Sequence, residues 1–104
     1  MSKKRIISEL TNILAKALRH KIGSIVNKQE IYAQKYAKDA EVLFNEARKT
    51  ALKTNFNSYD KEQIKKLLKA KLRKELEEKD FIDNKKFEIM EKEIEKALKE
   101  LNLL

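Results

Sequence analysis

The stretch IISELTNILAKAL, Ile6 to Leu18, repeats apolar residues at steps of three and four. This spacing is typical of a helix with one wide apolar face, which must be buried against other elements. We predict a helix over residues 3–22. Gly23, the only glycine of the chain, stands where a helix end favours a left-handed residue. The basic run Arg19–Lys21 would then occupy the last turn, where positive charge suits the helix dipole.

Three further helices follow from the same periodicity. The predicted segments are residues 3–22, 28–53, 60–79 and 85–103. Helix 28–53 starts at a capping-box sequence, Asn27 to Glu30. Its inner row is rich in alanine, which lets a neighbouring backbone approach closely, so we expect this helix to be the central one. Asp60 lies near the start of the third helix, and Asp83 or Asn84 is expected to cap the fourth.

The composition favours an all-α fold in a single domain over residues 1–104. The chain has no proline and one glycine, and 41% of its residues are hydrophobic. Few residues therefore interrupt helices, and we predict a compact bundle of about four. The absence of cysteine excludes disulfides and thiolate chemistry and fits a reducing compartment. No stretch approaches the roughly 20 uncharged apolar residues that span a bilayer, and we expect a cytoplasmic protein.

Sequence patterns typical of catalysis or metal binding are missing. Di-metal bundles use Glu-x-x-His pairs, and the chain has a single histidine, His20. It has no Ser-His-Asp set and no glycine-rich phosphate loop. We therefore expect a protein that is not an enzyme and that uses no metal, cofactor or small-molecule substrate.

Histidine phosphotransfer through His20 is an alternative hypothesis. A small helical bundle with one histidine at the edge of an apolar face has the form of a phosphotransfer domain. Such motifs place an acid after the histidine, or a Lys-Gly pair three and four residues on. Here Gly23 stands near the expected place, but the lysine is missing.

The charge is strongly positive and uneven. The formal net charge is +8, and residues 1–54 hold 12 Lys or Arg against 5 Asp or Glu, whereas residues 55–104 hold 13 against 12. An excess of one sign on one half favours anionic partners, such as nucleic acid.

Basic residues recur at helical spacing on the sides of three predicted helices that face away from the apolar rows. Lys and Arg in such rows displace counterions from a phosphate backbone and bind it with little sequence preference. The leading hypothesis is a packaging, accessory or regulatory protein that binds DNA or RNA in this way. The predicted contacts are Arg5, Lys16, Arg19, Lys35, Lys38, Lys49, Lys53, Lys66, Lys69 and Arg73.

Three other interpretations of the charged helices remain open. The basic residues can be a solvated surface on a structural or adaptor protein that binds helices of other proteins. The junction Ile22–Asn27 has the length of a helix-turn-helix turn, although helix 28–53 is long for a recognition helix. Helix 60–79 has the composition of helices that lie on anionic membranes, but Lys71 and Glu75 intrude on its narrow apolar face.

The last helix carries a heptad-like apolar row, with steps of three and four residues. This row either closes the bundle or joins two copies of the chain, and we expect a protein partner or a homo-oligomer. The apolar C-terminal run Leu101-Asn-Leu-Leu104 also needs cover, which a second subunit would supply. The predicted oligomer interface consists of Phe87, Met90, Ile94, Leu101 and Leu104.

Overall fold

The protein is an all-α bundle, as its sequence predicts. The computed structural model describes residues 2–26, 30–78 and 85–104. Its helices are α1 (Lys3–Val26), α2 (Glu30–Ala51), α3 (Ser58–Glu77) and α4 (Lys86–Glu100), and the described residues include no strand. The bundle is elongated, measuring 40 × 22 × 20 Å.

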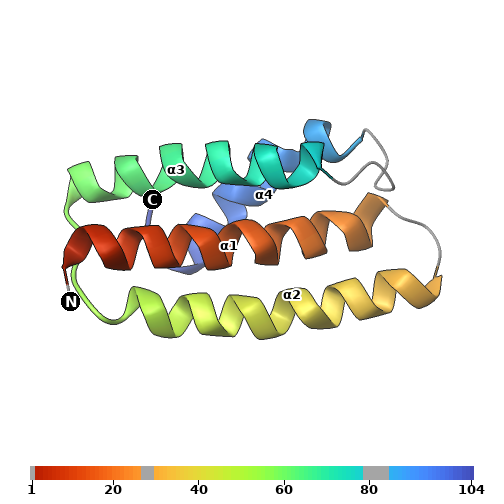
Figure 1. Cartoon of the computed structure of the whole chain (residues 1–104), viewed down its shortest axis with the longest axis horizontal. Coiled ribbons are helices and arrows are strands. Elements are labelled where there is room, and N and C mark those ends of the chain that lie inside the picture. Colours follow the sequence, from red (N-terminus) through yellow and green to blue (C-terminus); the bar gives the residue numbers. More distant parts are fainter. Residues whose placement is uncertain (1, 27–29, 79–84) are drawn as a thin grey trace.

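Helix α1 lies at the centre of the bundle. It packs against each of the other three helices, α3 and α4 also pack together, and α2 packs closely only against α1 (Figure 1). The prediction that the second helix is central is therefore wrong. The reason is that α1 buries side chains over a wider arc, which includes Thr11, Ala15 and Gly23 beside its leucines. The alanines of α2 do allow close approach, but to one neighbour.

The core is built from leucine and isoleucine rows on α1, α3 and α4. Each fully buried side chain of this size contributes roughly 1.5–3 kcal/mol through loss of contact with water. Helix α2 closes one side with small residues. The fully buried large apolar side chains are Leu10, Leu14, Leu18, Ile22, Ile64, Leu68, Leu72, Leu76 and Leu98.

Helix α1 does not end at Gly23. It continues to Val26. Gly23 is buried within the helix and does not have a positive φ. The basic run Arg19–Lys21 consequently lies one turn or more before the helix end, and the last turn holds no basic residue. The local preference of glycine for a helix end is overridden here by the burial of this turn in the bundle.

Helix α3 starts at a capping box that the sequence analysis did not identify. The Asn57 side chain accepts a hydrogen bond from the Asp60 backbone N–H at 2.8 Å, and the Asp60 carboxylate accepts one from the Asn57 N–H at 3.0 Å. Helix α4 has Lys85 at its cap position, without a side-chain hydrogen bond. The other predicted caps, Asn27 and Asp83 or Asn84, lie outside the described residues.

The C-terminus of α4 folds back on its own helix. Asn102 has φ 57°, the left-handed conformation, and the Leu103 N–H donates to the Leu98 carbonyl at 2.7 Å. Together with the bond from Asn102 N–H to the Lys99 carbonyl at 3.1 Å, this is a Schellman motif. It buries Leu103 to 4% exposure, so part of the apolar C-terminal run is covered within the chain.

Candidate functional site

The predicted oligomer interface on α4 is used inside the bundle. Met90 and Ile94 are buried, and Phe87 and Leu101 pack against the core from its edge. Leu104 is 58% exposed. Contact between two copies through Met90 and Ile94 is incompatible with this packing, because the same side chains already face α1 and α3. The apolar row of α4 closes the bundle, which is the alternative that the sequence left open.

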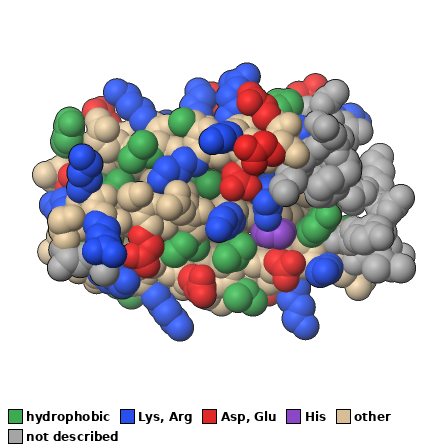
Figure 2. Space-filling model, viewed as in Figure 1, with side chains coloured by type: hydrophobic (Ala, Val, Ile, Leu, Met, Phe, Trp, Pro, Cys, Tyr) green, Lys and Arg blue, Asp and Glu red, His purple; other side chains and the backbone are tan. Residues whose placement is uncertain are grey.

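The ten predicted phosphate contacts do not share one surface. Helices α2 and α3, which carry six of them, flank α1 on opposite sides (Figure 1). Figure 2 shows the side on which α1 lies in front, and there Lys and Arg side chains are interspersed with Asp and Glu. The ten residues therefore do not form one continuous basic surface.

Four of these ten residues have carboxylate partners. Three of the pairs join different parts of the chain: Arg19 of α1 to Glu75 of α3, Lys69 of α3 to Glu91 of α4, and Lys53, two residues after α2, to Glu9 of α1. The fourth, Arg73 to Glu77, lies within α3. The charges of these four basic residues are therefore already matched in the folded chain. Among the described residues, no carboxylate lies within ion-pair distance of the remaining six, which are all exposed: Arg5, Lys16, Lys35, Lys38, Lys49 and Lys66.

A basic hollow lies between α1 and α3. Its volume is about 400 Å³, and Lys16 is the one predicted contact in it. Lys71 and Lys74 are not among the phosphate contacts predicted from the sequence. A signal for Lys71 was present, because it intrudes on the narrow apolar face of its helix. The lining residues are Asn12, Ala15, Lys16, Lys71, Lys74, Glu75 and Glu78.

Lys71 is held against α1 by two hydrogen bonds. Its ammonium donates to the Thr11 hydroxyl at 2.6 Å and to the Ser8 carbonyl at 3.1 Å. Thr11 is fully buried and donates in turn to the Ile7 carbonyl at 2.9 Å. Desolvation lowers the pKa of Lys71 below its ordinary value of 10.5. Across the described part of the chain, no carboxylate lies within ion-pair distance of this ammonium.

Arg19 organises the polar side chains beside the hollow. Its guanidinium donates to Glu75 at 2.9 Å and contacts His20 Nε2 at 2.9 Å. Because arginine can only donate, His20 Nε2 accepts in this arrangement. The His20 ring also lies 5.8 Å from the Tyr36 ring. His20 is thus a mid-helix residue in a polar network, and its predicted role at a helix C-terminus is wrong.

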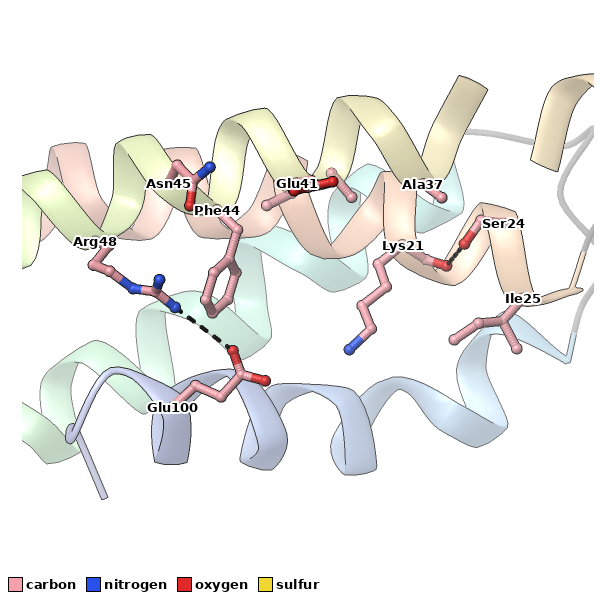
Figure 3. Close-up of a pocket in the computed structure, with 11 residues that line it drawn as sticks. Lys21, Ser24, Ile25, Ala37, Glu41, Phe44, Asn45, Arg48 and Glu100 are labelled. Atoms are coloured by element: carbon pink, nitrogen blue, oxygen red, sulfur yellow. Dashed lines mark hydrogen bonds and ion pairs between the residues drawn. The ribbon is translucent and has the colours of Figure 1, made fainter. Parts of the chain in front are cut away.

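A second depression lies between α2 and α4, over α1. Its volume is about 470 Å³, and Ala17, Ala37 and Ala40 contribute to its lining. Figure 3 shows the Phe44 ring directed into this groove. Arg48 lies over that ring at 5.4 Å from its centroid and closes one end of the groove by its contact with Glu100 at 3.8 Å.

An ion pair between the partly exposed Lys21 and the buried Glu93 joins α1 and α4 near this groove. Lys21 Nζ lies 2.9 Å from Glu93 Oε1, at ion-pair distance but without the geometry of a hydrogen bond. Figure 3 shows the Lys21 amine pointing toward α4. The Glu93 side chain is 4% exposed, and Lys96 lies 3.5 Å from its other oxygen. This pair fixes the position of α4 along α1.

Metal sites, membrane-spanning helices and similar proteins give no further indication of function. Within the described ranges, no three His, Asp or Glu side chains are grouped closely enough to hold a metal ion. No described helix is long and apolar enough to cross a bilayer. Comparison of the chain with protein-family models, curated proteins and solved structures found no match.

Proposed function

We propose that this chain is a non-catalytic protein that binds nucleic acid through its phosphate backbone, with little sequence preference. The contact surface is the exposed side of α1 together with the adjoining edge of α3. The observation that supports this most is the basic hollow. Lys16, Lys71 and Lys74 line it together, and the described residues place no carboxylate within ion-pair distance of any of the three. Elsewhere in the described bundle, five lysines have a carboxylate partner, namely Lys3, Lys21, Lys53, Lys69 and Lys96.

The exposed strip of α1 extends this surface along the molecule. Arg5, Asn12 and Lys16 are exposed on it, and Arg5 lies eleven residues before Lys16. At 1.5 Å per residue this separation is roughly 16 Å. A strand of duplex DNA carries a phosphate for about every 3.4 Å of helix axis, so a strip of this length can face several phosphates.

The chemistry of the strip favours backbone contact over base recognition. Helix α1 holds no Phe, Tyr or Trp, so it offers no platform for the stacking that single-strand binders use. Binding that depends on Lys and Arg alone is largely independent of sequence.

A salt titration with unrelated duplexes tests this function. We expect affinity to fall linearly on a logarithmic plot against salt, with a slope of about 0.9 for each phosphate neutralised. The double variant Arg5→Gln, Lys16→Gln should reduce that slope by about 2. The control Lys92→Gln, Lys99→Gln removes the same charge from exposed positions of α4 and should leave the slope nearly unchanged. Absence of binding at low salt, or equal effects of both variants, would contradict the proposal.

The groove between α2 and α4 supports a second candidate, an adaptor that binds a helix of another protein. Its lining of small residues leaves room for a helix backbone, and Ile25 at the end of α1 is 50% exposed. Peptides selected on the wild-type chain from a random display library test this. We expect amphipathic helices whose binding is lost in Ala37→Arg and kept in the exposed-site control Ala70→Arg. If no selected peptide discriminates between the two variants, this candidate fails.

A further inference from the structure

We propose that the hollow between α1 and α3 is a seat for a single phosphate group, with Lys71 as its anchor. This inference rests on the proposed function and deepens it, because it names the point where one backbone phosphate is held. The ligand chemistry is a tetrahedral oxyanion, which either a nucleic-acid phosphodiester or a free phosphate presents. The hollow has a volume of about 400 Å³, enough for such a group with some of its water.

The ammonium of Lys71 is positioned before any ligand arrives. An ammonium has three N–H donors, and two of them bond to Thr11 Oγ1 at 2.6 Å and to the Ser8 carbonyl at 3.1 Å. Among the described residues, no acceptor is recorded for the third donor, and Lys71 lines the hollow. Thr11 is itself fully buried and bonded to the α1 backbone. Little side-chain entropy is therefore lost when Lys71 binds an anion, unlike with an ordinary surface lysine.

The partial desolvation of Lys71 strengthens its interaction with an anion. Neither of its two hydrogen-bond acceptors carries a charge, and no carboxylate lies within ion-pair distance of it in the described ranges. A cation with neutral partners in a partly dry site gains more from an incoming negative charge than a fully hydrated one. Lys71 thus has both the position and the unmatched charge of an anchor.

The other lining residues complete a site that suits phosphate. Lys16 and Lys74 supply further positive charge, and the Asn12 amide offers a neutral donor. Of the two acids, Glu75 is bonded to Arg19 at 2.9 Å, so its charge is already matched. Glu78 is the one opposing charge, and it lies at the C-terminal cap of α3. The negative charge of Glu78 therefore weakens the binding of phosphate in the hollow.

NMR of the lysine ammonium groups tests the seat on the full chain. Inorganic phosphate and dimethyl phosphate serve as separate probes, each against sodium chloride at equal ionic strength. We expect both phosphates to shift the Lys71 and Lys74 ammonium signals to saturation, with little change at Lys92 on α4. Equal shifts at Lys71 and Lys92, or none, would overturn the seat. Saturation by inorganic phosphate alone would overturn the nucleic-acid backbone as the source of the ligand.

Three variants identify the residues responsible. Lys71→Met should weaken phosphate binding by about tenfold or more, as loss of a charged hydrogen bond predicts. Glu78→Gln should tighten it, because the opposing charge is removed. Lys74→Gln, at an exposed site, keeps the test valid if Lys71→Met fails to fold. Unchanged binding in Lys74→Gln and in a folded Lys71→Met, or weaker binding in Glu78→Gln, would overturn the assignment.

The seat and the proposed function can fail separately. Salt-dependent duplex binding without saturable phosphate binding would overturn the seat and leave the function standing. Saturable phosphate binding without any duplex binding would overturn the function and leave a small-anion site at Lys71.

Discussion

Asn57 and Asp60 fix the start of α3 through reciprocal hydrogen bonds at 2.8 and 3.0 Å. Loss of a side-chain cap usually costs about 1 kcal/mol. We therefore expect Asn57→Ala to lower the free energy of unfolding by about that amount in urea denaturation. Asn55→Ala, in the same loop and exposed, is the control. Equal losses in the two variants would show that the cap contributes nothing specific.

The Asp60 carboxylate also makes stability depend on pH. Its hydrogen bond from the Asn57 N–H, followed by the ion pair with Lys3 at 3.0 Å, lowers the pKa of Asp60 below its ordinary 3.8. As the pH falls, the Asp60 carboxylate is therefore protonated in the unfolded chain before it is protonated in the folded chain. The contribution is complete above pH 3.8 and is lost as the pH falls toward the lower folded value.

Urea denaturation at a series of acidic pH values measures this contribution. The variant Asp60→Asn should be less stable than wild type at neutral pH and should lose less stability on acidification. Glu91 titrates in the same direction, because its hydrogen bond from Lys69 lowers its pKa, so part of the acid dependence will remain. Parallel curves for the variant and wild type would contradict the role given to Asp60.

At the scale of elements, the apolar row of α4 belongs to the bundle. Ile94→Ala should lower the free energy of unfolding by about 2–5 kcal/mol, as truncation of a buried side chain predicts. Leu104→Ala, at a residue that is 58% exposed, should change it by less than about 0.5 kcal/mol. Sedimentation should be the same for wild type and both folded variants. A change of oligomeric state in Ile94→Ala would contradict this assignment.

The C-terminal motif of α4 makes a separate prediction at Asn102. A non-glycine side chain without local hydrogen bonding costs roughly 1–2 kcal/mol in the left-handed conformation. Asn102→Ala should therefore destabilise the chain, whereas Asn102→Gly should keep or raise its stability in thermal unfolding. The reverse order would show that this residue does not adopt φ 57° in solution.

The sequence predicted the helices well and their arrangement less well. Spacing alone identifies a helix, because an apolar row at steps of three and four can be buried only as one face. The end of α1 was predicted too early, at Gly23. In sequence, a glycine buried between neighbouring helices cannot be distinguished from one at a helix end. The alanine row of α2 indicated close packing, but such a row does not show how many neighbouring helices pack against it.

At the scale of the whole molecule, the charge pattern depended on which helices became neighbours. Arg19 and Lys69 were predicted as phosphate contacts, yet each meets a carboxylate from another helix, Glu75 and Glu91. Such pairs depend on which helices pack together, and the sequence pattern of one helix does not give that information. Lys71 is the opposite case. The sequence places it on the narrow apolar face of its helix, and in the structure it lies against α1 and lines the hollow with Lys16.

Amide NMR of the isotope-labelled chain with an unrelated DNA duplex at low salt locates the surface that binds nucleic acid. We expect the largest signal changes along the exposed strip of α1, from Arg5 to Arg19, and at Lys71–Glu78 on α3. The outer faces of α2 and α4 should change little. Largest changes on α4 or on the outer side of α2, or no changes at all, would contradict this expectation.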